Sequence, residues 1–164
     1  MNLIPIGIIH SPHQQASGTP VQASLATTQG TVELFPPFVA GLKNLDGFDR
    51  IWLMYWFDRA APAQLVVAPY LDTAPRGLFA TRAPCRPNPL GLSCVRLLEV
   101  RDNVLRVEGL DILDRTPLLD IKPYLPAFDA FETTRTGWFG RIPREAAVAD
   151  ERFSAGHQRA EPEA

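Results

Sequence analysis

The chain has 164 residues and a mass of 18.1 kDa, with 46% hydrophobic and 21% charged residues. This composition suits one folded domain and excludes global disorder, while a net charge of -2 and a pI near 5.9 exclude capture of nucleic acid by bulk charge alone. The longest unbroken apolar run, residues 51–57, is far too short to span a bilayer.

Residues 3–9 are apolar and favour a first strand, which the Ser11-Pro12 pair ends. No Lys or Arg precedes this run and no cleavage motif of small residues follows it, so it does not resemble a signal peptide. Residues 10–29 are polar and carry no Asp, Glu, Lys or Arg, and we expect them to form a long loop. A short second strand is expected at residues 31–34.

A short helix is expected next, because Pro36-Pro37 suits a first helical turn and the apolar side chains behind it share one face. Asp46-Gly47 ends this helix. Residues 48–57 are rich in aromatic and β-branched side chains and favour a central buried strand. Residues 60–75 are rich in Ala and Pro and are expected to form a surface loop.

The second half of the chain again favours short strands, which the pattern places at residues 78–81, 93–100, 104–110 and 118–121. Short strands, one or two brief helices and many prolines predict a mainly-β fold, a small β-barrel. We expect one domain over residues 1–140 and a C-terminal extension over residues 141–164 whose end is disordered. No Gly-x-Gly-x-x-Gly follows a strand, so a Rossmann-type nucleotide site is unsupported.

Two cysteines, Cys85 and Cys94, stand nine positions apart and match no zinc or redox spacing. Reduced thiols, no metal site and a cytoplasmic location are therefore expected. The basic residues are almost all Arg, which suits bidentate contacts with phosphate or carboxylate. A genome that favours Arg codons would produce the same bias.

The densest pattern of the sequence is residues 77–93, where three prolines follow Arg82 and stiffen an extended loop that carries Arg86 and Asn88. Stiffening lowers the entropy lost on binding, which suits a loop that holds a ligand. A Pro-rich connection with solvated arginines is the alternative interpretation.

A second pattern covers residues 110–126, where a turn at residues 114–117 leads into a strand. Asp120, Lys122 and Tyr124 would share one face of that strand. A plain ion pair between Asp120 and Lys122 explains the same pattern.

In this order, the two segments resemble the TsaA/YaeB-like (TrmO-type) family. Its markers are a Phe-Ala-Thr-Arg…Arg-Pro-Asn-Pro-x-Gly loop and an Asp-x-Thr-Pro…Asp-Ile-Lys-Pro-Tyr strand, and the similarity covers roughly residues 3–128. The resemblance implies a dimeric, non-Rossmann β-barrel methyltransferase that binds S-adenosylmethionine. It further implies a tRNA acceptor, N6 of a threonylcarbamoyl-adenosine beside the anticodon. Longer bacterial members carry a C-terminal domain with no counterpart in this sequence, which leaves the acceptor open.

The resemblance also implies which residues form the cofactor site: Pro20, Val21, Gln22, Asp58, Arg59, Arg82, Leu92, Ile112, Leu113, Asp114 and Arg115. Val21 stands where the family has Arg, the pair Asp58-Arg59 stands where it has a His-Gln type of pair, and Arg115 replaces a common Gly. Arg82 would pair with the carboxylate of the cofactor or, alternatively, with RNA phosphate.

Methylation at N6 requires that the nitrogen lose its proton, and the candidates for handling it are Asp114, Asp120 and Tyr124, with His10 and His13 weaker. The residues expected to contact the substrate are Arg76, Arg86, Asn88 and Lys122. Two other functions fit the same sequence. One is a non-catalytic module that binds S-adenosylmethionine or RNA, and the other is a methyltransferase with a different acceptor.

Overall fold

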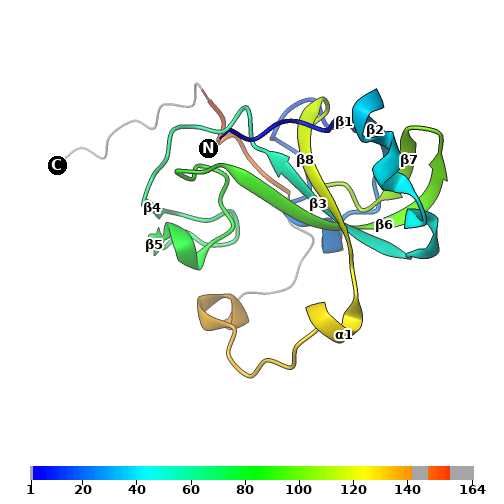
Figure 1. Ribbon diagram of the computed structural model, residues 1–164. Coiled ribbons are helices and arrows are strands. Elements are labelled where there is room, and N and C mark those ends of the chain that lie inside the picture. The colour runs from blue at the N-terminus through cyan, green and yellow to red at the C-terminus, as the bar shows by residue number, and fades with distance from the viewer. Residues whose placement is uncertain (1, 142–147, 156–164) are drawn as a thin grey trace.

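Six antiparallel strands close into a barrel in a computed structural model that describes residues 2–141 and 148–155 (Figure 1). Around the barrel the strands follow the order β1-β2-β7-β6-β3-β8. They are β1 (Gly7–His10), β2 (Gln29–Leu34), β3 (Arg50–Trp56), β6 (Leu90–Arg101), β7 (Val104–Glu108) and β8 (Thr116–Pro123). The structure therefore confirms the small, mainly-β barrel expected from the sequence.

The core fills the barrel because successive side chains of each strand point to opposite faces. On β3, Ile51, Leu53 and Tyr55 are buried, and the residues between them are half-buried on the outer face. β3 pairs with β6 on one side and β8 on the other, so it is the central strand that its aromatic and β-branched sequence predicted.

The helix expected after Pro36-Pro37 is broken into two 3-10 helices, Pro36–Leu42 and Leu45–Gly47. Asn44 separates them because its φ of 65° is left-handed and cannot continue a helix. Leu42 and Leu45 are both buried against the barrel core, as the shared apolar face predicted.

The strand expected at residues 78–81 is wrong: Leu78–Ala80 is a 3-10 helix. Only Leu78 is buried there, and the backbone N–H of Thr81 donates to the Leu78 carbonyl at 3.0 Å, which closes a helical turn instead of a sheet ladder. Strand pairing in this region is confined to the two-residue strands β4 (Val66–Val67) and β5 (Arg76–Gly77). β4 therefore interrupts the expected surface loop of residues 60–75.

Strand ends also differ from the expectation. β1 begins at Gly7, although the Ile6 N–H still donates to the Leu118 carbonyl at 2.8 Å, and β6 begins at Leu90 rather than at residue 93. Helices that the sequence pattern did not predict are Ala23–Leu25, α1 (Pro126–Asp129) and Gly137–Arg141. No helix among the described residues is long and apolar enough to cross a membrane.

Residues 148–155 of the expected C-terminal extension pack back onto the loops beside the barrel (Figure 1). Val148 pairs with Pro20 and Ser154 pairs with Ala60 in isolated antiparallel bridges. Phe153 is buried in a small second cluster that also contains Leu78 and Cys85. Apart from Ala155, the tail expected to be disordered lies outside the described residues.

Candidate active site

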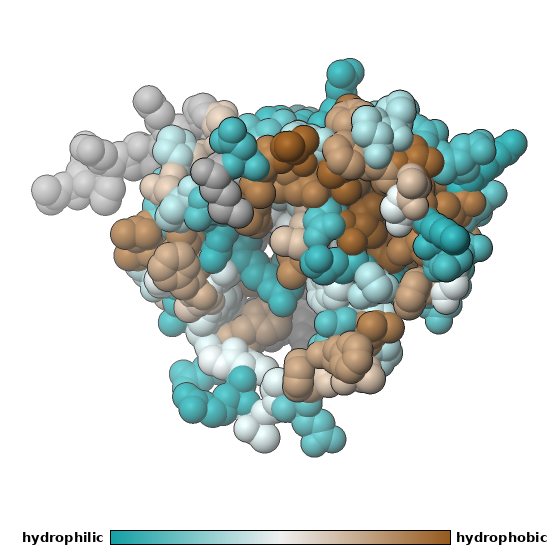
Figure 2. Space-filling model, in the orientation of Figure 1, coloured by the Kyte–Doolittle hydropathy of each residue, from teal (hydrophilic) through white to brown (hydrophobic). Residues whose placement is uncertain are grey.

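A cavity of about 400 Å³ lies between the barrel and the segment that joins β3 to β6, which contains β4 and β5. Figure 2 shows the surface hollowed between these two parts of the molecule. Its size falls within the range of ordinary small-molecule sites. Its lining comes from five parts of the chain: residues 16 and 19–22, β3 with the residues after it, the Pro-rich loop with the start of β6, residues 111–113 and 116, and residues 149, 153 and 154.

Asp111 is a half-buried carboxyl that lines the cavity, and it is the end of a hydrogen-bonded relay. The Ser93 hydroxyl donates to Asp111 Oδ1 at 2.6 Å, so the Ser93 oxygen accepts from the Tyr55 hydroxyl 3.0 Å away. Burial raises the pKa of the Asp111 carboxyl, and the hydrogen bond from Ser93 and the charge of Arg82 oppose that rise only in part. Burial also raises the pKa of the Tyr55 phenol, which therefore stays protonated.

Tyr55 fits against β6 only because residue 91 is glycine. Gly91 pairs with Tyr55 across β3 and β6, and a Cβ on Gly91 would lie 2.1 Å from Cε2 of the tyrosine ring. Glycine thus allows the ring to lie flat against the backbone of β6. Both residues line the cavity, so the glycine of the Pro-rich motif shapes the cavity wall.

Arg82 is the cation at the mouth of the cavity. Its Nη1 donates to Gln22 Oε1, and Gln22 Nε2 donates to the Val21 carbonyl at 2.7 Å. Because the partner is a neutral amide, this contact orients the guanidinium without neutralising it. Arg82 is exposed and can bind an anionic group of a ligand.

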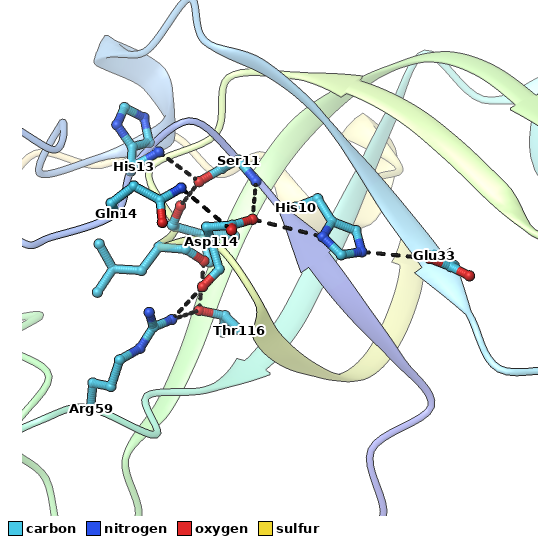
Figure 3. A network of polar contacts seen from close by, with 10 residues as sticks. His10, Ser11, His13, Gln14, Glu33, Arg59, Asp114 and Thr116 are labelled. Atoms are coloured by element: carbon cyan, nitrogen blue, oxygen red, sulfur yellow. Dashed lines mark hydrogen bonds and ion pairs between the residues drawn. The ribbon is translucent and has the colours of Figure 1, made fainter.

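Residues 110–116 form a loop that the N-terminal segment holds in place (Figure 3). The Ser11 hydroxyl donates to the Ile112 carbonyl at 2.6 Å, and the Asp114 N–H donates to the His13 carbonyl at 2.7 Å. Arg59 Nη2 donates to the Asp114 carbonyl at 2.7 Å and to Thr116 Oγ1 at 3.0 Å. These bonds fix the backbone that lines the cavity before any ligand binds.

The Asp114 carboxylate itself belongs to this support (Figure 3). It accepts hydrogen bonds from the Ser11 N–H at 3.1 Å and from Gln14 Nε2 at 3.4 Å, and His10 Nδ1 lies 3.7 Å away. Slight burial works against ionisation, but these hydrogen bonds outweigh it and lower the pKa of Asp114. Next to it, Arg115 has a φ of 62°, a left-handed conformation that glycine adopts more readily than arginine, in agreement with the glycine that the family resemblance implies at this position.

Nine of the eleven residues implied for the cofactor site line the cavity. They are Pro20, Val21, Gln22, Asp58, Arg59, Arg82, Leu92, Ile112 and Leu113. Asp114 and Arg115 lie in the supporting loop and are not among the described residues that line the cavity.

The residues expected to contact the substrate or to handle the proton do not gather at one place, unlike those implied for the cofactor. Arg86 lines the cavity and donates to the Thr81 carbonyl at 3.2 Å, while Asn88 is exposed. Arg76 pairs with Asp72 at 2.6 Å, and Lys122 pairs with Asp120 at 2.8 Å on the surface. Tyr124 packs edge-on against Trp52, with ring centroids 5.8 Å apart, and Trp52 lines the cavity.

Sequence reasoning missed Asp111, Tyr70 and Phe153 as cavity residues. Asp111 stands one position before Ile112, and its hydrogen-bond partner Ser93 is 18 positions away in the sequence. Tyr70 and Phe153 pack edge to face at 4.9 Å, and they come from a loop and from the C-terminal extension. A short apolar-and-acidic stretch at residues 148–154 gave no signal that it would return to the site.

A family model described as the tRNA-methyltransferase O N-terminal domain matches residues 8–130, which include the barrel and most of the cavity wall. The chain belongs to the TrmO family. Among relatives of this TrmO-family chain is a probable S-adenosyl-L-methionine-binding protein of Pyrococcus abyssi. It is 55% identical over 152 residues, which are 91% of this chain and 83% of the relative.

A tRNA (adenine(37)-N6)-methyltransferase of Escherichia coli K12 is 37% identical over 156 residues, which cover 88% of this chain and 66% of the relative. A crystal structure of TrmO from Pseudomonas aeruginosa superposes with a TM-score of 0.73 at 39% identity. The superposition covers 88% of this chain and 63% of that protein. The chain thus spans less than two thirds of these two longer TrmO-type proteins.

Proposed function

We propose that this TrmO-family chain is an S-adenosylmethionine-dependent methyltransferase that uses the cavity beside the barrel. The observation that carries the proposal is that nine residues implied for the cofactor, from four separate segments of the chain, line one cavity. Relatives named as S-adenosylmethionine-binding proteins and methyltransferases support it.

The cavity has the groups that such a cofactor needs. Arg82, which takes part in none of the ion pairs among the described residues, offers its guanidinium to the α-carboxylate, and its contact with Gln22 orients it before binding. The aromatic rings of Phe57, Tyr70 and Phe153 give apolar walls for the adenine and for the sulfonium. When bound, the cofactor would supply an electrophilic methyl group. Because Val21 stands in place of the usual Arg, we assign the carboxylate of the cofactor to Arg82.

The residues of the chain would contribute orientation and proton removal. Asp111 is a carboxylate that lines the cavity, and burial raises its pKa, so it is a stronger base than an exposed carboxylate. Ser93 and Tyr55 hold it through the hydrogen-bonded relay. We therefore propose Asp111 as the proton acceptor, in preference to Asp114 and Asp120, whose carboxylates are engaged outside the cavity.

The proposed acceptor is N6 of threonylcarbamoyl-adenosine next to the anticodon of tRNA, and the proposed compartment is the cytoplasm. The name of the Escherichia coli relative supports an adenine N6 acceptor. The acidic pI and the small number of arginines near the cavity predict weak tRNA binding overall. We expect a log–log salt slope of roughly -2 to -4, since only a few phosphates are contacted.

The test is methyl transfer from labelled S-adenosylmethionine to paired tRNA substrates, with and without the threonylcarbamoyl group, followed by nucleoside mass spectrometry. We expect label only in the modified nucleoside. Equal labelling of both tRNAs would overturn the acceptor. No labelling of either, while the cofactor binds in calorimetry, would favour a non-catalytic binding module.

A further inference from the structure

A second cavity, of about 560 Å³, adjoins the first. The two cavities share six lining residues, which are Val21, Gln22, Tyr70, Thr81, Arg82 and Phe153. The second cavity differs from the first in its aromatic wall, to which Phe79, Trp138 and Phe139 contribute. The two cavities therefore adjoin along these shared residues, and Arg82 is one of them.

Part of the aromatic wall comes from residues beyond the family match. The 3-10 helix Gly137–Arg141 carries Trp138 and Phe139, which pack edge to face with centroids 5.9 Å apart. Trp138 Nε1 donates to the Ala80 carbonyl at 2.8 Å, which fixes the indole against the Pro-rich loop. Phe79 on that loop is 77% exposed, an unusual position for a phenylalanine that only served the core.

Arginines stand against these rings. The guanidinium of Arg76 lies 5.5 Å from the Trp138 ring, and that of Arg86 lies 5.7 Å from the Phe79 ring. Arg76 is neutralised by Asp72, but the ion pairs of the described residues include neither Arg82 nor Arg86. Residues 73–98 contain no Asp or Glu. The surface around the second cavity therefore favours an anion.

Exposed rings beside uncompensated arginines are typical of sites that bind single-stranded nucleic acid. An apolar peptide would use the rings but would leave the arginines without partners. Inorganic phosphate would use the arginines but would leave the rings exposed. A nucleotide uses both, because its base stacks and its phosphate pairs.

We propose that the second cavity holds the acceptor nucleotide of an RNA strand, with the base stacked on Phe79 and Phe139 and with a neighbouring phosphate on Arg86, whose guanidinium lies against the Phe79 ring. This inference rests on the proposed methyl transfer, since a base in the second cavity would adjoin a cofactor in the first across the lining residues that the two cavities share. An enzyme that modifies a base must take it out of the stack, and an aromatic cavity receives such a base.

The test compares two fluorescein-labelled RNA hairpins, one with an adenosine in the loop and one with an abasic site at the same position. Binding is measured by anisotropy in the presence of S-adenosylhomocysteine. Phe79→Ala is the test variant and Phe131→Ala the control, because the two phenylalanines are 77% and 80% exposed and Phe131 lies outside both cavities.

We expect Phe79→Ala to weaken binding of the adenosine hairpin about 5- to 100-fold and to leave binding of the abasic hairpin unchanged. Phe139→Ala should act in the same direction, and Phe131→Ala should bind both hairpins as the unmodified chain does. Equal affinities of Phe79→Ala and Phe131→Ala for the adenosine hairpin would overturn the base site. An equal loss of affinity for both hairpins would also overturn it, because it would mean that the Phe79 ring positions Arg86 for phosphate and does not stack on a base.

Calorimetry with S-adenosylmethionine separates this inference from the proposed function. If the unmodified chain binds the cofactor but Phe79→Ala behaves like the control, the base site fails and the methyltransferase stands. If the unmodified chain distinguishes the two hairpins but binds no cofactor, the base site stands and the methyltransferase fails.

Discussion

At the scale of single residues, Asp111 has the strongest expected effect on catalysis. If it accepts the proton, Asp111→Asn should lower kcat by about 10²- to 10⁴-fold while the affinity for S-adenosylmethionine changes little. Asp120→Asn makes the same carboxylate-to-amide change on the surface. Comparison of the two variants shows whether Asp111 or Asp120 accepts the proton. A larger loss in Asp120→Asn than in Asp111→Asn would move the proton acceptor out of the cavity.

The same substitution has a pH-dependent effect on stability. Burial raises the pKa of Asp111 above its usual 3.8. A raised carboxyl pKa gives stability that is fully present below the unfolded-state pKa and is lost as the pH rises through the folded-state pKa. The ionised carboxylate therefore weakens the fold at neutral pH. Asp111→Asn should raise Tm at pH 7, and the difference should shrink as the pH falls toward 4; a difference that grows on acidification contradicts this.

Arg82→Ala tests the anion-binding side of the cavity. The loss of charge-assisted hydrogen bonds should weaken S-adenosylmethionine binding by roughly 10- to 100-fold, since such bonds contribute about 1.5–3 kcal/mol. Arg82 is exposed, so circular dichroism should show an unchanged fold. Arg96→Ala is the control because Arg96 pairs with Glu108 away from the cavity. Unfolding of Arg82→Ala would make this arginine structural.

At the scale of elements, the contact between β3 and β6 depends on Gly91. Gly91→Ala would press a methyl group into the Tyr55 ring, and overpacking of this kind costs about 1–3 kcal/mol. Gly77→Ala is the matched control, because a Cβ there meets no atom within 4 Å. Thermal unfolding should show a marked loss of stability for the first variant and almost none for the second. Similar Tm values would show that the tyrosine ring moves freely aside.

Elements with a clear two-residue period were predictable from the sequence, and β3 is the best example. The strand expected at residues 78–81 failed because four residues with one buried side chain fit a helical turn as well as a strand. The family resemblance anticipated residues that line the candidate cavity where they lie in its motifs, as at Arg82 and Ile112. Asp111 and Phe153 were not, because their roles depend on contacts with residues 18 or more positions away, which no local pattern contains.

At the scale of the whole molecule, we expect a homodimer. The outer face of β3 and β6 places Met54 opposite Leu92 and Trp56 opposite Leu90, an apolar surface that a partner would cover. Light scattering at micromolar concentration should give twice 18.1 kDa. Met54→Glu should shift the mass toward the monomer. A monomeric unmodified chain would contradict the homodimer. A dimer that survives Met54→Glu would show that the interface lies elsewhere.

Because residues 148–154 return to the cavity, the barrel and the cavity are completed at different stages of synthesis. A nascent chain contains every strand of the barrel once Pro123 has been made. The cavity wall is complete only when Phe153 and Ser154 have also been made. Cofactor binding is therefore expected only after residues 149–154 have been made, which is later than the last strand of the barrel. A chain that ends at residue 140 should keep its circular dichroism spectrum and lose calorimetric binding of S-adenosylmethionine. Full binding by that shorter chain would mean that residues 141–164 are not needed to complete the cofactor site.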